Sequence, residues 1–433
     1  MSDARSRFFD RGVAFLLHRH FVLGCLAVNI SLRLVLIVML PVSMASDASW
    51  YFNRAVGIAA GHGYSEDGLP TAYWPVGYPG FLGIMFSVFG SHVFVAQLAN
   101  VLLAAMSALL TLALGRIMLR DEVPARLAML LLSVYPNNIA YASLTLSETL
   151  FTSVLMLGTY IYIRSRGWLG IFFSGVVFGV AALVKPQVLF FPLVLIGIRA
   201  LRELQPPRAR VALSALILYA AMISVLAPWS VRNFLVFHDV VLISTNGGPT
   251  LLTGNTGDKA GARGNFSPDD PLVVQMRFSV ADQVAANKRA TRLAVEWIRH
   301  NPGRFLALVP LKIWWLWAPD GEAEWAYQAG FDRYHDHVMA FRVARIVNQI
   351  FYVAVLGAFA VSACMVAARG APSPWLFLSY GLAAYVTIIS IVFSGQSRYH
   401  APVMPWIMIA SAWSMVEALR WWSSRFHTAR IPP

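Results

Sequence analysis

The 433-residue chain has few charged residues, few cysteines and little lysine. Charged side chains make up 13% of it and hydrophobic ones 58%, whereas a soluble domain is about a quarter charged and about half apolar. This balance excludes an ordinary soluble domain. The only cysteines, Cys25 and Cys364, both lie inside apolar runs, which excludes a disulfide framework and a cysteine-based metal site. The basic residues are arginines except for Lys185, Lys259, Lys288 and Lys312.

The chain contains many long runs of apolar residues. Since roughly 20 apolar residues cross a bilayer, they predict an all-α polytopic membrane protein with about 10 to 12 transmembrane helices. Two further apolar stretches, 76–90 and 304–318, contain proline and are short, so we expect helices lying in the outer interface. The predicted spans cover residues 21–41, 92–115, 124–142, 146–163, 168–184, 187–201, 210–228, 347–367, 372–393 and 401–419.

The arginines indicate how the chain is oriented. With the N-terminus in the cytoplasm, the short loops that are rich in arginine fall on the cytoplasmic side and the short outer turns are poor in arginine and lysine, in agreement with the positive-inside rule. Both termini are then cytoplasmic, and residues 1–433 form one integral-membrane domain with two large outer segments, 42–91 and 229–346. Because the formal net charge of +13 is concentrated in short loops, it does not indicate a nucleic-acid partner.

Specific ionisable residues recur at the outer ends of the predicted spans. Asp47 follows the first span, Glu148 begins the fourth, Lys185 lies in the turn after the fifth, and Arg398 precedes the last. A carboxylate can take a proton from a hydroxyl group, and cations can hold a phosphate and stabilise it as a leaving group. We therefore predict that Asp47 and Glu148 are catalytic and that Arg398 and Lys185 bind a phosphate.

Further residues belong to the same predicted site. In a helical "DASWYFNR", Asp47, Tyr51 and Arg54 share one face, and Arg54 either binds phosphate or pairs with Asp47. A Gly/Asn-rich loop over 244–258 either contacts a ligand or is a plain turn-rich loop. Arg33, deep in the first span, is expected to contact a helix carbonyl or a polar cavity. The predicted substrate-binding residues are Tyr51, Tyr78, Asn246, Asn255, Tyr399 and His400.

The order of these motifs carries a resemblance to a known family. "PVGYPGFLGIMFSVFG" at 75–90 is followed by "SETLF", then "KP", and finally "SRYHAPVMP" before the last span. Over residues 30–410 the chain resembles the GT-C integral-membrane glycosyltransferases. Within them it resembles the dolichyl-phosphate-mannose protein mannosyltransferase-like group, which includes bacterial transferases that modify lipid A and core oligosaccharide.

The resemblance implies a fold and an activity. It implies an inverting glycosyltransferase in the bacterial inner membrane, with a polyprenyl-phosphate sugar donor, a lipid or glycan acceptor and an active site facing the periplasm. By matching position, Asp47 is the base or the acceptor-orienting carboxylate, and Arg398 contacts the donor phosphate. Ala48 stands where protein mannosyltransferases have a glutamate after the aspartate, which argues against a protein acceptor. The first loop reads Tyr73-Trp74-Pro75, without the lysine of aminoarabinose-type relatives.

Two other functions and one cofactor question stay open at this point. A transporter or lipid flippase would place its ionisable groups near the membrane midplane and often shows repeats. Here the charges lie at the outer ends, except for Arg33, and the sequence shows no repeat. A non-catalytic subunit of a surface-polysaccharide assembly complex would keep its function after substitution of Asp47. No cofactor is assigned, since the spacing of Asp47 and Glu148 neither requires nor excludes a divalent metal ion.

Overall fold

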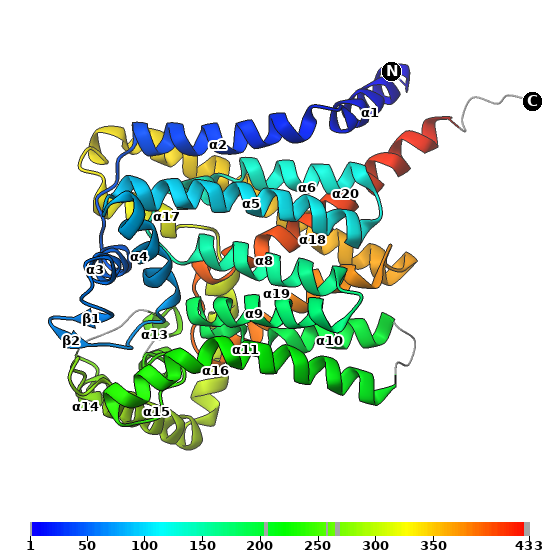
Figure 1. Ribbon diagram of the computed structural model, residues 1–433. Helices are drawn as coiled ribbons and strands as arrows, with labels where there is room; N and C mark the ends of the chain where they lie inside the picture. Colours follow the sequence, from blue (N-terminus) through cyan, green and yellow to red (C-terminus); the bar gives the residue numbers. More distant parts are fainter. Residues whose placement is uncertain (1, 203–206, 257–258, 265–268, 428–433) are drawn as a thin grey trace, which may run out of the picture.

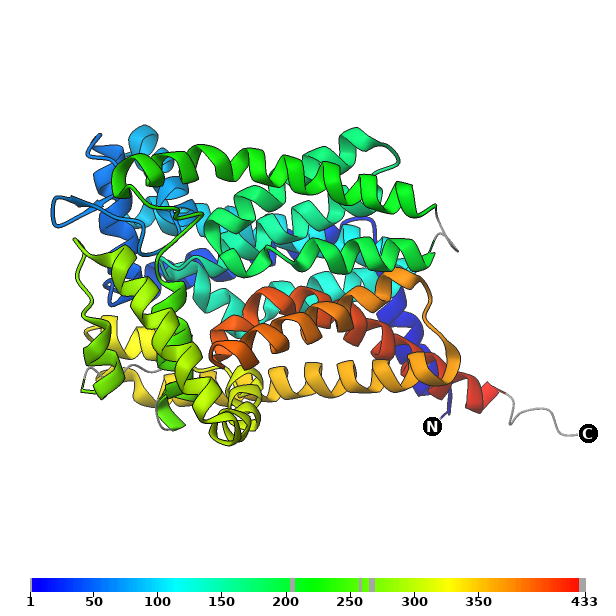
Figure 2. The same ribbon diagram turned by 90° about the horizontal axis from the view of Figure 1, so that it is seen from below.

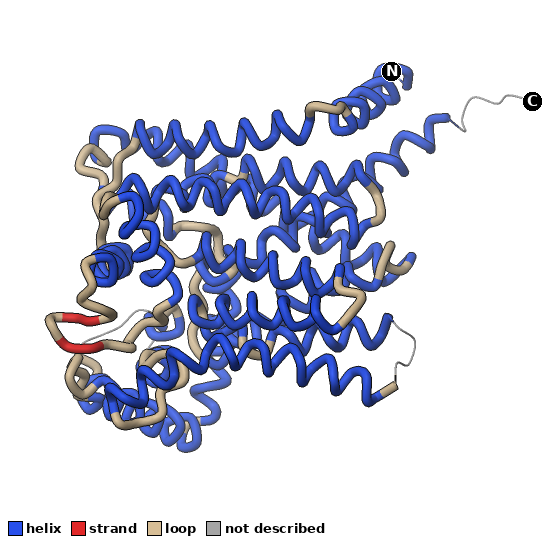
Figure 3. The backbone as a smooth tube through the Cα atoms, in the orientation of Figure 1, coloured by secondary structure: helices blue, strands red, loops and turns tan. Residues whose placement is uncertain are grey.

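The computed structural model describes residues 2–202, 207–256, 259–264 and 269–427, and is helical almost throughout (Figures 1 and 3). Within these ranges the sheet is one antiparallel hairpin, β1 (Ser65–Glu66) and β2 (Leu69–Pro70). Its turn places Asp67 and Gly68 at positive φ, as a tight two-residue hairpin turn requires.

A bundle of helices runs side by side through the body of the molecule. Figures 1 and 2 show α1 (Ser2–Leu17) and the far end of α20 at one end of this bundle. The bundle helices are α2 (Phe21–Met39), α5 (Val93–Leu119), α6 (Glu122–Val134), α8 (Glu148–Arg164), α9 (Trp168–Val184), α10 (Phe191–Arg202), α11 (Arg208–Phe237), α18 (Val338–Arg369), α19 (Phe377–Val392) and α20 (Met404–His427).

Shorter helices gather around the other end of the bundle, together with the hairpin (Figure 1). All of them come from the two segments 42–91 and 229–346. They are α3 (Asp47–Ala59), α4 (Gly77–Phe89), α12 (Gly247–Thr256), α13 (Lys259–Ala262), α14 (Pro271–Met276), α15 (Gln283–His300), α16 (Pro302–Trp317) and α17 (Glu322–Gly330).

The number of membrane-crossing helices is smaller than predicted. Every predicted span contains a helix, but six helices in the described ranges are long and apolar enough to cross a membrane, or seven if one bent pair counts as a span. The difference has a physical reason. At 1.5 Å per residue, a helix of 12 or 13 residues such as α10 or α6 falls short of a roughly 30 Å hydrocarbon core.

The bent pair lies where the predicted span 124–142 ends. After α6 the chain breaks at Tyr135, forms the short α7 (Pro136–Ala140), and then turns by 115° into α8. The buried guanidinium of Arg33 holds this break. Its Nη1 donates to the carbonyls of Asn29 at 2.8 Å and Ser133 at 3.2 Å, and its Nη2 donates to Asn138 Oδ1. This confirms a structural contact of Arg33 with helix carbonyls and satisfies a carbonyl left open at the end of α6.

The two stretches expected at the interface form helices, α4 and α16, and their position in a membrane stays a prediction. The side chain of Lys312 in α16 is fully buried within the protein. Its Nζ donates to Asn255 Oδ1 and to the carbonyl of Ile391 at 2.9 Å. Burial lowers the pKa of Lys312 to about 8. Lys312 therefore ties α16 to α12 and α19.

Helix α9 packs closely against α11 through two glycines one turn apart. A Cβ at Gly175 would lie 2.3 Å from the carbonyl oxygen of Leu218, and one at Gly179 would lie 2.9 Å from that of Met222. Small residues at this spacing allow two helix backbones to approach within the membrane.

We therefore expect Gly175→Ala to separate α9 from α11 and to destabilise the protein by about 1–3 kcal/mol through overpacking. The measurement is unfolding of the purified protein in detergent. The matched control is Gly197→Ala in α10, where the new methyl group meets nothing within 4 Å. Equal stability of the two variants would contradict the close packing.

Candidate active site

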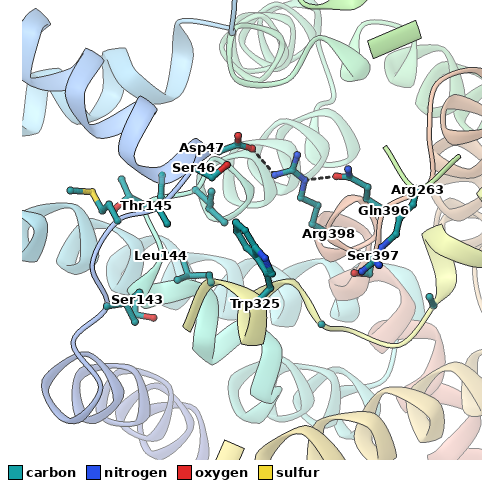
Figure 4. Close-up of a pocket in the computed structure, with 18 of the residues that line it drawn as sticks. Ser46, Asp47, Ser143, Leu144, Thr145, Arg263, Trp325, Gln396, Ser397 and Arg398 are labelled. Atoms are coloured by element: carbon teal, nitrogen blue, oxygen red, sulfur yellow. Dashed lines mark hydrogen bonds and ion pairs between the residues drawn. The ribbon is translucent and has the colours of Figure 1, made fainter. Parts of the chain in front are cut away.

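Asp47 and Arg398, which are 351 positions apart in the sequence, form an ion pair. The pair lies at the end of the bundle where the short helices gather. Arg398 Nη1 donates to Asp47 Oδ2 at 2.7 Å, and Arg398 Nε donates to Gln396 Oε1 at 2.7 Å (Figure 4). The side chains are 26% exposed for Asp47 and 17% exposed for Arg398. The structure thus brings together the predicted base and the predicted phosphate ligand, and leaves both within reach of a bound molecule.

Local backbone structure explains how each member of the pair is presented. Asp47 is the first residue of α3, where the helix dipole favours a carboxylate. Ser46 before it has φ of 52°, a conformation that non-glycine residues rarely adopt and that marks functional sites. Arg398 lies in a 3₁₀ turn, Ser397–Tyr399, between α19 and α20. That loop touches α16, where a Cβ at Gly395 would be 1.9 Å from the carbonyl of Lys312.

A second ion pair lies nearby, and it joins the other predicted carboxylate and lysine. Lys185 Nζ donates to Glu148 Oε1 at 3.0 Å. Glu148 begins α8 and is buried, while Lys185 follows the end of α9 and precedes Pro186. Glu148 Oε2 is buried without a hydrogen-bond partner among the described residues. Glu148 therefore pairs with Lys185, the lysine that the sequence analysis predicted to bind a phosphate.

Two cavities meet at the Asp47–Arg398 pair. The larger has a volume of about 740 Å³ and the smaller about 530 Å³, and Asp47, Leu146 and Arg398 line both. Figure 4 shows the larger one, with the indole of Trp325 pointing toward the ion pair. Its further aromatic and basic lining residues are Trp314, Trp315, Arg263 and Arg345.

The smaller cavity contains the second ion pair and an apolar rim. Glu148 and Lys185 line it, together with Tyr51, Asn246 and Tyr399, three of the residues predicted to bind substrate. Burial raises the pKa of Tyr51, and the nearby charges of Asp47 and Glu148 raise it further. The phenol of Tyr51 therefore stays protonated and can donate a hydrogen bond. The rim includes Phe190, Val240 and Leu242, each more than 60% exposed.

Three other residues predicted to bind substrate line neither cavity. Tyr78 is fully buried and packs edge-on against Tyr51, with ring centroids 5.4 Å apart. Asn255 is fully buried, and its Nδ2 donates to the carbonyl of Val392 at 2.9 Å. The predicted Gly/Asn-rich loop is largely the helix α12, and positions 257–258 of it lie outside the described residues. Tyr78 therefore packs behind Tyr51, and Asn255 connects α12 to the end of α19.

Arg54 also lies apart from both cavities. Its guanidinium lies over the Trp50 ring at 5.4 Å and within 3.9 Å of Glu66 Oε1. Of the two alternatives for Arg54, the structure does not show the pairing with Asp47, because Arg398 donates to that carboxylate. Binding of a phosphate by Arg54 stays a prediction. Arg54 instead connects α3 to the hairpin.

His400 is the third predicted residue that lines neither cavity, and it belongs to a buried network. Its Nε2 lies 2.8 Å from Asp320 Oδ1 and its Nδ1 lies 2.6 Å from the carbonyl of Leu316. Both neighbours offer oxygen atoms, so the two ring nitrogens of His400 bridge Asp320 and Leu316. The ring is stacked between Trp317 and Tyr352. His400 thus fastens the Arg398 loop to the end of α16.

Sequence reasoning missed Asp320 and the tryptophans of the larger cavity. Asp320 Oδ2 accepts from Tyr135 at 2.5 Å and from Asn348 at 3.3 Å, so three distant segments satisfy one carboxylate. No local motif marks such a residue. The signal available for Trp314, Trp315 and Trp325 was a cluster of tryptophans between 314 and 325, which is also typical of a membrane interface.

A metal ion at the candidate site would need a set of protein ligands that lie close together. Among the residues that the structure describes, no three His, Cys, Asp or Glu side chains lie close enough to hold a metal ion. Asp47, the carboxylate at the junction of the cavities, already contacts a guanidinium. We therefore derive no step through a metal ion.

Comparisons with known proteins show the fold. No family model matches the chain, and no curated protein matches it by sequence. The oligosaccharyltransferase of Archaeoglobus fulgidus, in a complex with Zn and sulfate, has a TM-score of 0.51 at 14% identity over 94% of this chain and 51% of that one. The oligosaccharyltransferase AglB from Archaeoglobus fulgidus, in complex with an inhibitory peptide and a dolichol-phosphate, has a TM-score of 0.50 at 13% identity over 96% of this chain and 52% of that one.

A third structure, ArnT of Cupriavidus metallidurans bound to undecaprenyl phosphate, has a TM-score of 0.42 at 13% identity over 91% and 78%. The chain spans about half the length of the archaeal enzyme. This chain is an all-helical membrane protein with the GT-C fold, which confirms the fold that the motif order predicted.

We expect His400→Ala to lower the free energy of unfolding by about 1–3 kcal/mol, because it leaves Asp320 Oδ1 buried without its hydrogen-bond partner. Denaturant or thermal unfolding in detergent measures this. His62→Ala is the control, since His62 is exposed. A His400→Ala protein as stable as the control would show that the network does not hold the loop.

Proposed function

We propose that the protein is a glycosyltransferase. It would transfer a sugar from a polyprenyl-phosphate donor to a hydroxyl group of a lipid or glycan acceptor, at the outer face of a bacterial inner membrane. The single observation that carries this proposal is the Asp47–Arg398 pair on the wall shared by two cavities. The fold, which is that of an enzyme solved with a dolichol-phosphate, supports it.

The smaller cavity suits the donor. Lys185 and Arg398 supply two positive charges for a phosphate group. The exposed apolar rim of Phe190, Val240 and Leu242 suits an isoprenoid chain that stays in contact with the membrane. The larger cavity, with its three tryptophans, suits the acceptor, because flat apolar rings pack against the faces of sugar rings.

The reaction follows from what each residue can do at this junction. The acceptor hydroxyl oxygen attacks the anomeric carbon while Asp47 orients the hydroxyl and accepts its proton. The bond between the anomeric carbon and the phosphate oxygen breaks, and its electron pair stays on the polyprenyl phosphate. Arg398 and Lys185 stabilise the charge that develops there. Attack from the cavity opposite the leaving group inverts the anomeric configuration.

The ion pair also orders the two binding events. The guanidinium of Arg398 donates to the carboxylate of Asp47. A donor phosphate competes for that guanidinium and weakens its hold on Asp47. The carboxylate then becomes available to the acceptor hydroxyl only when a donor is in place, which limits wasteful reaction of the donor with water.

We expect Asp47→Asn to reduce transfer by about 100-fold or more, because the amide cannot accept the proton. Mass spectrometry of envelope lipids and glycans would compare cells that lack the gene with cells restored by wild type, by Asp47→Asn or by Asp67→Asn. Asp67 is the matched control, an exposed carboxylate in the hairpin turn. A product restored by Asp67→Asn but missing with Asp47→Asn supports the proposal and identifies sugar and acceptor.

Normal product from Asp47→Asn cells would contradict a catalytic Asp47 and favour the non-catalytic subunit. Unchanged lipids and glycans in the deletion cells would contradict the transferase and return the transporter or flippase to first place.

The assignment of the two cavities has its own test. We expect Lys185→Gln to raise the KM for the donor with little change in the KM for the acceptor, since glutamine keeps a hydrogen bond to Glu148 and removes the charge. We expect Trp325→Ala to do the reverse. Steady-state kinetics on purified protein measures both, and a reversed pattern would exchange the roles of the cavities.

A further inference from the structure

A third cavity lies at the other end of the bundle, away from the candidate active site. It has a volume of about 320 Å³ and lies among the ends of four helices, α8 to α11. Helix α8 begins at Glu148 in the candidate site and ends at Arg164 beside this cavity, and α9 returns from Trp168. The polar and aromatic residues that line it are Tyr162, Arg166, Trp168, Arg199, Arg210 and Ser214.

The cavity concentrates positive charge. Three arginines line it, and none of the described lining residues is acidic. The guanidinium of Arg199 is held in place, since its Nη2 donates to the carbonyl of Ser165 at 3.0 Å and it lies 5.3 Å from the centre of the Tyr162 ring. Arg166 and Arg210 are exposed, and neither has a carboxylate partner among the described residues. Converging guanidinium groups in a concave site attract an anion with several acceptor oxygens.

Apolar surface adjoins this charge. On α9, Leu169 is 69% exposed, directly after the 44% exposed Trp168. On α11, Leu216 is 66% exposed, less than two turns beyond Arg210. Arginines at a helix end with exposed tryptophan and leucine beside them are typical of the boundary between headgroups and acyl chains. A ligand that satisfies both surfaces carries a phosphate and hydrocarbon chains.

We propose that this cavity binds the phosphate headgroup of an anionic phospholipid, with its acyl chains along the exposed faces of α9 and α11. A volume of about 320 Å³ holds a headgroup and leaves the chains outside. The bound headgroup bridges the α8–α9 turn, the last turn of α10 and the first turn of α11, where charged pockets between membrane helices recognise such lipids. It therefore stabilises the helices whose opposite ends carry Glu148 and Lys185.

The test uses the full-length protein in nanodiscs of neutral phosphatidylcholine, with and without added phosphatidylglycerol. We expect phosphatidylglycerol to raise the temperature of thermal unfolding of the wild type by several degrees. The double variant Arg166→Gln/Arg210→Gln should lose more than half of that rise while unfolding normally in neutral lipid. The matched control is Arg19→Gln/Arg369→Gln, which removes two exposed arginines at the same end of the bundle but outside the cavity.

Each outcome decides the proposal. A rise that is equally reduced in both double variants would overturn it, because the attraction would then be a general one between lipid and basic loops. A parallel experiment adds inorganic phosphate to protein in neutral nanodiscs. An equal rise with inorganic phosphate, lost in the cavity variant, would show a free-phosphate site and overturn the lipid assignment. Native mass spectrometry should show that the wild type and the control variant retain bound phosphatidylglycerol. The cavity variant Arg166→Gln/Arg210→Gln should have lost it.

None of these readouts measures sugar transfer. The lipid proposal and the proposed transferase function can therefore each fail without affecting the other.

Discussion

The bilayer imposes the constraint on which the rest of this structure depends: each backbone N–H and C=O group within the hydrocarbon must be satisfied by the protein itself. Helices meet this requirement locally, and the body of the molecule is accordingly a helical bundle. Irregular backbone within a membrane occurs where side chains or a water-filled cavity satisfy the free N–H and C=O groups. The break between α6 and α7 exists because the guanidinium of Arg33 serves carbonyls and an amide there. The loops and short helices at the end of the bundle opposite α1 line the two cavities of the candidate site.

Buried polar side chains position the candidate site by joining helices that are distant in sequence. Lys312 connects α16 to α12 and α19, and His400 connects the loop of Arg398 to the end of α16 through Asp320 and Leu316. Each such contact is demanding, since removal of one partner leaves a buried charge or acceptor unpaired. That demand fixes the arrangement of the short helices around Asp47. A site at the junction of several segments thus gains rigidity without a sheet or a disulfide.

The junction itself suits a reaction with two substrates. Because Asp47 and Arg398 belong to the walls of both cavities, one ion pair can respond to a phosphate on one side and a hydroxyl on the other. Lys185 adds positive charge only on the phosphate side. The asymmetry between a cavity with an exposed apolar rim and a cavity lined by three tryptophans is what distinguishes the two proposed substrates.

The sequence by itself determined the class of fold, because hydrophobic runs and arginine placement obey the bilayer directly. The motif order also indicated Asp47, Glu148, Lys185 and Arg398, since ionisable residues at span ends are few and stand out. The sequence could not determine that Glu148 pairs with Lys185, or that Arg54 turns toward Glu66. It also could not show that the side chains of His400 and Asn255 are buried, or that the carboxylate of Asp320 binds Tyr135, Asn348 and His400. Those outcomes depend on which helices become neighbours, and tertiary packing between segments hundreds of residues apart decides which helices these are. The periodicity of the sequence describes the faces of one helix and carries no information about its neighbours.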